Sequence, residues 1–154
     1  MSAWLMVALV ALGLPRTVLA DLDVVAPESG FVYYVLALTP FAVWLVVAVA
    51  RRSRRPFLDF LVLGVLYGLS LVLVHQALWD VGDSLGHRPP EGAVSFADQF
   101  SGIWHDLALR GYTSVIALVI GVGTGLIMAL IATLAHHVRR TSNASAEQNP
   151  QGRA

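Results

Sequence analysis

The sequence predicts an all-α integral membrane protein, a four-helix transmembrane bundle with an extra short amphipathic helix in an outer loop. Of its 154 residues, 56% are hydrophobic and only 13% are charged, whereas a soluble domain carries about a quarter charged residues. The apolar residues form four blocks of roughly 20, the length that crosses about 30 Å of hydrocarbon as a helix. Unpaired backbone polar groups are not tolerated in lipid, so each block is interpreted as a helix.

The four transmembrane helices are expected at residues 2–20, 31–50, 57–79 and 112–135. The first block has a second interpretation, a signal peptide cleaved after Ala20, because the residues before that position suit a signal peptidase. No basic residue precedes this block, and Arg16 comes late in it, so an uncleaved helix is favoured. Both interpretations leave the second helix running in the same direction.

The outer loop between the third and fourth blocks contains a helical pattern at residues 95–110. Its apolar residues recur every three or four positions, as on one face of a helix, at Phe96, Phe100, Ile103 and Leu107. Gly111 fits a helix stop, and we expect this amphipathic helix to rest on the outer leaflet or on the bundle. Residues 1–140 thus form a single membrane domain, and the polar residues 141–154 are expected to be a disordered cytoplasmic tail.

Arginine residues set the predicted orientation. They form two clusters, namely Arg51, Arg52, Arg54 and Arg55 before the third block and Arg139 and Arg140 after the fourth. Basic residues near the ends of membrane helices collect on the cytoplasmic side, so we interpret both clusters as cytoplasmic anchors. Arg139 and Arg140, together with His136 and His137, are expected to bind anionic lipid headgroups. The acidic residues fall mainly in the other loops. We therefore expect a multi-pass protein of the plasma (inner) membrane with both termini in the cytoplasm.

Small residues predict how the helices associate. They recur at every fourth position, as Gly64 and Gly68 in the third block and as Ala117, Gly121, Gly125 and Ala129 in the fourth. Lipid tails are as apolar as leucine, so membrane helices associate through the close packing that small residues allow. The third and fourth helices are therefore predicted to pack face to face.

Polar residues close the third block and form the candidate ligand-binding site, namely His75, Gln76, Trp79, Asp80 and Asp83. At about 100° per residue, His75 falls on the same helix face as Gly64 and Gly68, toward the other helices. An ionisable residue that faces its neighbours within a membrane helix is a functional hypothesis by default. The alternative is an interfacial histidine bonded to a loop carbonyl or to water, with Trp79 in the aromatic belt at the membrane surface.

The composition excludes several kinds of chemistry. The chain has no cysteine and no lysine, which rules out disulfides, thiolate metal sites and Schiff bases. No histidine or carboxylate spacing is typical of a metal site, and no nucleophile has a supporting base at a suitable spacing. The leading expectation is therefore no cofactor, no metal and no enzymatic activity. The net charge is zero, so nucleic acid is not an expected partner.

Three functions remain open from the sequence. The leading hypothesis is a non-catalytic accessory or interaction protein, whose partners are membrane lipids and either another membrane protein or further copies of the same chain. The second is a ligand-handling protein that binds a metal, a lipid headgroup or a quinone near His75 at the outer interface. The third is a small transporter or an oligomeric channel.

Overall fold

The computed structural model describes residues 1–22, 24, 30–51, 55–81 and 89–147 of the chain. Its labelled elements are all helices, namely α1 (Ala3–Asp21), α2 (Gly30–Ala50), α3 (Pro56–Ala77), α5 (Glu91–Ala97) and α6 (Ile103–Glu147). Four of them, α1, α2, α3 and α6, are long and apolar enough to cross a membrane. The prediction of an all-helical chain with four such helices is therefore confirmed.

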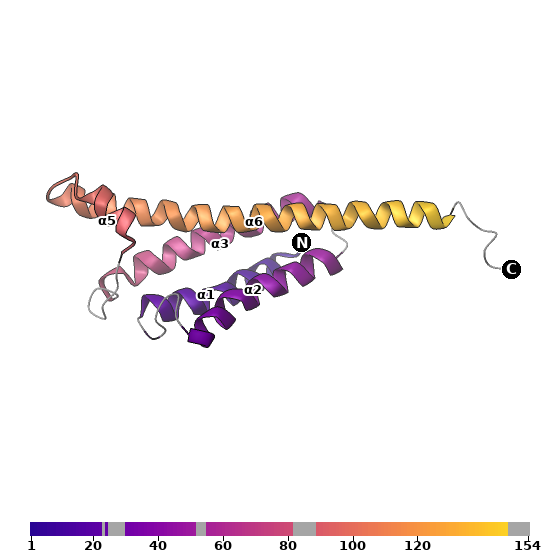
Figure 1. Ribbon diagram of the computed structural model, residues 1–154, viewed down its shortest axis with the longest axis horizontal. Coiled ribbons are helices and arrows are strands. Elements are labelled where there is room, and N and C mark those ends of the chain that lie inside the picture. The colour runs from indigo at the N-terminus through magenta and orange to yellow at the C-terminus, as the bar shows by residue number, and fades with distance from the viewer. Residues whose placement is uncertain (23, 25–29, 52–54, 82–88, 148–154) are drawn as a thin grey trace.

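The four long helices form a bundle in which each has two main neighbours (Figure 1). α3 packs against α1 and α6, and α2 packs against the same two helices. α1 and α3 run in the same direction, because their N-terminal ends lie together and their C-terminal ends lie together. The amino group of Met1 lies 2.6 Å from the Asp59 carboxylate, and the Asp21 carboxylate lies 2.8 Å from the His75 imidazole. α6 is the longest helix and projects beyond the others at its C-terminal end (Figure 1).

α3 and α6 approach each other until their backbones touch. A Cβ atom built on Gly121 would lie 2.3 Å from the Cα atom of Gly68, and one built on Gly64 would lie 2.5 Å from the Cα atom of Gly125. Both distances are far inside van der Waals contact, so a larger residue would force the helices apart. The closest approach of α3 and α6 therefore lies at the glycines whose four-residue spacing stands out in the sequence.

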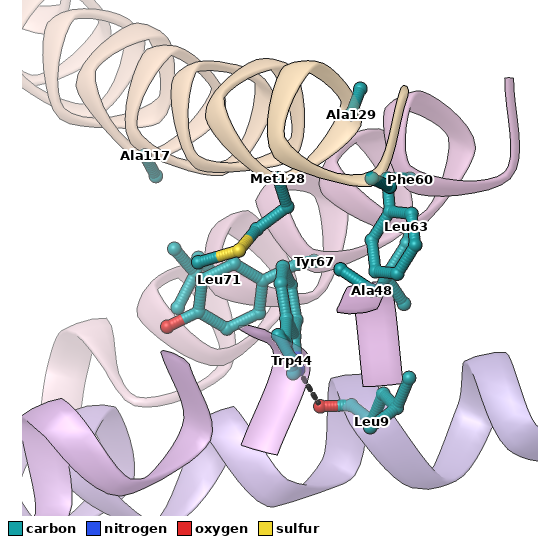
Figure 2. Packing of buried hydrophobic residues seen from close by; sticks show 11 residues of the cluster. Leu9, Trp44, Ala48, Phe60, Leu63, Tyr67, Leu71, Ala117, Met128 and Ala129 are labelled. Carbon is teal, nitrogen blue, oxygen red and sulfur yellow. Dashed lines mark hydrogen bonds between the residues drawn. The ribbon is translucent and has the colours of Figure 1, made fainter. Parts of the chain in front are cut away.

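The centre of the bundle is filled by aromatic side chains (Figure 2). Trp44 of α2 is fully buried, and its indole Nε1 donates a 3.0 Å hydrogen bond to the backbone carbonyl of Leu9 in α1. Its ring meets the Tyr67 ring of α3 edge to face, with 5.4 Å between the centroids. Tyr67 in turn lies against Gly13 of α1, where a Cβ atom would come within 2.6 Å of the ring. One tryptophan thus connects three helices while its polar N–H is satisfied.

The predicted amphipathic helix at residues 95–110 is wrong as a single element. α5 ends at Ala97 and α6 begins at Ile103. Gly102 between them has φ = 60°, in the left-handed region that favours glycine, and this conformation breaks the helical path. The predicted stop at Gly111 is also wrong, because α6 continues through it. A glycine inside a helix costs only about 1 kcal/mol, which is too little to end a helix packed along its length.

Two further boundaries differ from the prediction. α3 ends at Ala77, so Trp79 lies beyond the helix rather than at its last position. α6 continues to Glu147, so part of the tail expected to be disordered is helical, and residues 148–154 lie outside the described residues. At 1.5 Å per residue, the 45 residues of α6 span about 67 Å, roughly twice the hydrocarbon thickness. α6 therefore combines a segment long and apolar enough to cross a membrane with an extension at each end.

Replacing Gly121 with alanine should destabilise the bundle, because the new methyl group would push α3 away from α6. Overpacking of this kind costs about 1–3 kcal/mol, which exceeds the roughly 1 kcal/mol that alanine otherwise gains over glycine in a helix. Thermal unfolding in detergent, followed by circular dichroism, measures the change. Gly123→Ala is the matched control, since a Cβ atom there meets nothing within 4 Å, and it should keep or raise the melting temperature. Equal melting temperatures for the two variants would contradict the glycine contact.

Candidate functional site

α1 and α3 end side by side, and this brings a carboxylate against an imidazole. Oδ2 of Asp21, the last residue of α1, lies 2.8 Å from Nδ1 of His75 in the last turn of α3. The Asp21 side chain is only 7% exposed, whereas the His75 side chain is 29% exposed. The distance is that of an ion pair when the imidazole is protonated. Among the described residues, Oδ2 of Asp21 is buried and accepts no hydrogen bond. A carboxylate buried this deeply is costly without an ion-pair partner.

These two residues line a cavity of about 180 Å³ between α1, α3 and α6, which we call the Asp21–His75 pocket. Its polar lining comes mainly from the ends of α1 and α3, at Arg16, Thr17, Asp21 and His75, with Thr113 on α6. Its apolar lining comes mainly from α3 and α6, at Leu71, Ile116, Ala117 and Ile120, with Trp79 beyond the end of α3. The pocket therefore has one polar side and one aliphatic side, the combination that binds an amphipathic molecule.

Two α1 side chains complete the polar side of the pocket. Arg16 donates a 3.0 Å hydrogen bond to the hydroxyl of Tyr33 in α2, and its guanidinium carbon lies 5.7 Å from the centroid of the same ring. The hydroxyl of Thr17 is buried and has no hydrogen-bond partner among the residues that the structure describes. A buried hydroxyl without a partner costs about 1–3 kcal/mol, so a polar atom that bonded Thr17 would recover this free energy.

A second polar network lies beside the pocket, at the ends of α3 and α6. The Gln76 side-chain amide donates to the Ser114 hydroxyl at 3.0 Å, and the Arg110 guanidinium donates to the Asp80 carboxylate at 3.1 Å. The guanidinium of Arg110 also lies over the Trp79 ring, 4.9 Å from its centroid. Because Trp79 lines the pocket, the cation–π contact with Arg110 helps to hold one wall of the pocket in place.

The five predicted ligand-binding residues are divided between these two arrangements. His75 and Trp79 line the pocket, whereas Gln76 and Asp80 belong to the network around Arg110. The Asp80 side chain is 88% exposed, so its carboxylate is well solvated even beside Arg110. Asp83 lies outside the described residues.

The α1 residues of the pocket are not among those predicted from the sequence. Arg16, Thr17 and Asp21 close the first apolar block, where polar residues are equally consistent with a membrane interface and with a signal peptide. Asp21 matters through its contact with His75, which lies far away in the chain, and Arg16 and Thr17 line the same cavity. The one usable signal is the pair of opposite charges at the end of an apolar segment, because charges at such a position need partners or water.

The predicted cytoplasmic anchors gather at the opposite end of the bundle. Three of them line a second cavity of about 150 Å³, namely Arg51, Arg139 and Arg140. Arg55 directly precedes α3 and is exposed. Arg52 and Arg54 lie outside the described residues. Charge is thus distributed unevenly, with a carboxylate–imidazole pair at one end of the bundle and a cluster of guanidinium groups at the other.

Metal coordination is not supported by this arrangement. Within the described part of the chain, no group of three or more histidine or acidic residues could hold a metal ion. The Asp21–His75 pair offers two protein ligands, whereas zinc sites in proteins use three or four. The chemistry available in the pocket is therefore hydrogen bonding and ion pairing.

Comparisons with family models, with curated proteins and with solved structures find no match for this chain. No relative therefore supplies a function by analogy. The two cavities, their charges and their positions in the bundle are the evidence from which a function can be argued.

A double-mutant cycle should detect the contact between Asp21 and His75. We expect a coupling free energy of about 0.5–3 kcal/mol, the range for residues in one buried network, when each is replaced by alanine singly and together. Thermal or denaturant-induced unfolding in detergent provides the four stabilities. The matched cycle on Asp80 and Arg110 should give only about 0.2–1 kcal/mol, as exposed ion pairs do. A coupling for Asp21 and His75 no larger than that of the exposed pair would mean that the buried contact is absent in solution.

Proposed function

We propose that the chain is a multi-pass protein of the plasma (inner) membrane that binds a lipophilic molecule with a ring-sized polar headgroup in the Asp21–His75 pocket. The observation that carries the proposal is a cavity that combines aliphatic walls with a buried carboxylate and a partly exposed imidazole. The cavity lies at the ends of apolar helices, where the tail of such a molecule could remain in lipid while its ring enters the protein. A quinone is a molecule of this kind.

The size of the pocket supports a single ring as the headgroup. Its volume of about 180 Å³ is slightly above the roughly 150 Å³ of an engineered apolar cavity that holds one benzene molecule. Pockets that enclose a whole drug-sized ligand are larger, at about 300 Å³ or more. The pocket would therefore enclose a headgroup and leave an attached tail outside.

The polar groups of the pocket match the oxygen atoms of a neutral ring. An imidazole N–H of His75 and the hydroxyl of Thr17 can donate to a carbonyl oxygen, and the carboxylate of Asp21 can accept from a hydroxyl group. Asp21 would repel a phosphate, and the single guanidinium that lines this pocket, Arg16, also contacts Tyr33. These charges favour a quinone-like headgroup over an anionic lipid headgroup at this end of the bundle.

The packed core argues against a transport pathway through one chain. The centre of the bundle is filled by the fully buried side chains of Trp44, Leu63 and Tyr67 (Figure 2). A pathway for an ion or a polar solute would need water or polar groups along this stretch. Binding is therefore a better account of the pocket than transport.

A second candidate function, an accessory protein that contacts another membrane protein, is favoured by the N-terminal extension of α6. Ile103, Trp104 and Leu107 lie on this extension and are 80%, 64% and 59% exposed. Contiguous apolar side chains exposed outside the hydrocarbon region mark a contact with lipid or protein. This role is compatible with ligand binding, because none of the three residues lines the Asp21–His75 pocket.

Filling the pocket should abolish ligand binding. Ala20 lines the pocket, and Ala20→Leu should weaken the binding of decylubiquinone by about tenfold or more, because the added side chain occupies the site of the ring. Native mass spectrometry of the full-length protein in detergent measures both the molecule that copurifies and the added quinone. Ala11→Leu is the matched control, since Ala11 is an exposed residue of the same helix. The proposal fails if the wild-type chain binds no quinone, or if both variants lose binding equally.

The proposed orientation can be tested by labelling single cysteines, since the chain has no cysteine of its own. Glu91→Cys lies at the start of α5, at the end that carries the Asp21–His75 pocket, and Thr141→Cys lies near the arginine cluster. In intact cells, a membrane-impermeant maleimide should label Glu91→Cys and should label Thr141→Cys only after lysis, because arginine-rich ends stay in the cytoplasm. The reverse pattern would place the pocket on the cytoplasmic side and overturn the proposed topology.

A further inference from the structure

A second cavity, at the opposite end of the bundle from the Asp21–His75 pocket, is lined by basic side chains. Its volume is about 150 Å³, and we call it the basic pocket. Its charged or titratable lining consists of Arg51, His136, Arg139 and Arg140, and its walls are completed by Ala48, Pro56 and Ala132. None of these residues is acidic, so the described part of the chain contributes no negative side chain to the lining of this pocket.

The bundle itself does not neutralise these positive charges. Among the residues that the structure describes, the side chains of Arg51, His136 and Arg140 take part in no hydrogen bond or ion pair. The guanidinium of Arg139 donates to the carbonyl of Val49 in the last turn of α2, which leaves its other N–H groups available. Several like charges that converge on one cavity repel one another, and an anion relieves that repulsion.

The backbone at the start of α3 also favours an anion in the basic pocket. Pro56, the first residue of α3, lies in the wall of the basic pocket. The N-terminus of a helix carries a partial positive charge and unsatisfied N–H groups, both of which favour an anion. Asp59 lies in this first turn, and its carboxylate meets the amino group of Met1.

The two pockets are separated by about the thickness of a membrane. His136 in the basic pocket follows Ala117 in the Asp21–His75 pocket by nineteen positions along α6, which is about 28 Å along the helix. The hydrocarbon core of a bilayer is about 30 Å thick. If one pocket lies at the outer interface, the other lies at the inner interface, at the level of the lipid phosphates.

We propose that the basic pocket binds the phosphate group of an anionic phospholipid of the inner leaflet. Guanidinium groups bind phosphate oxygens through paired, charge-assisted hydrogen bonds, and basic pockets between membrane helices on the cytoplasmic side hold anionic headgroups. The small side chains of Ala48 and Ala132 leave room for a phosphate between α2 and α6. This inference rests on the membrane orientation proposed above, and it does not depend on the ligand of the Asp21–His75 pocket.

Lipid titration of the full-length protein in detergent, read by native mass spectrometry, tests this inference. The probes are phosphatidylglycerol, phosphatidylcholine with the same acyl chains, and inorganic phosphate. We expect one phosphatidylglycerol to bind about tenfold or more tightly than phosphatidylcholine, and the Arg51→Gln/Arg140→Gln double variant to lose that preference. Arg55→Gln removes a positive charge at the same end of the bundle but outside the residues that line the pocket, and it should change binding by less than about twofold.

Each other outcome has a defined meaning. The Arg51→Lys/Arg140→Lys variant should keep most of the preference for phosphatidylglycerol, because it preserves the charge. It also shows whether changing these two side chains disturbs folding. Equal binding of the two lipids, or equal loss in the two glutamine variants, would overturn the site. Displacement of phosphatidylglycerol by equimolar inorganic phosphate would identify free phosphate as the ligand and overturn the lipid assignment. Ala20→Leu should leave lipid binding unchanged, so failure of the Asp21–His75 pocket and failure of the basic pocket are distinguishable.

Discussion

The contact between the backbones of α3 and α6 at their glycines determines the geometry of the rest of the bundle. Two helices that touch without intervening side chains are fixed more firmly than helices joined by flexible groups. α3 crosses α6 near this contact and then separates from it toward its C-terminal end (Figure 1). The Asp21–His75 pocket lies in that region, between Leu71 and His75 of α3 and Ile120 of α6. The glycine contact and the Asp21–His75 pocket therefore both result from the angle at which α3 crosses α6.

The four long apolar helices and their main interface could be predicted from the sequence because both depend on local patterns. A helix in lipid must satisfy its own backbone, so about 20 apolar residues are enough to identify it. The four-residue spacing of glycine is likewise a property of one segment, and it identifies the faces of α3 and α6 that meet. The break at Gly102 could not be predicted this way, because the apolar residues around it keep a helical spacing whether or not the chain turns between them.

The candidate site was predictable only in part, for a related reason. The helical period of α3 indicates that His75 faces other helices, and His75 does lie against α1. The period does not indicate which helix it faces, so Asp21 and Thr17 could not be assigned to it. Residues beyond the end of α3 are harder still to place from the sequence, because the helical period of α3 does not extend to them. Asp80 therefore lies in the solvated network with Arg110 rather than in the pocket.

The length of α6 has a mechanical consequence. The helix runs from Ile103 to Glu147, and its contact with α3 at Gly121 and Gly125 lies close to its midpoint. A stiff helix held near its middle can tilt about that point. The two halves on either side of the contact are each about 33 Å long at 1.5 Å per residue. A tilt of about 5° around this pivot would move each tip by about 3 Å in opposite directions. A force applied to the half near Trp104 would therefore displace the opposite end of α6, and it would also strain the contact between α6 and α2.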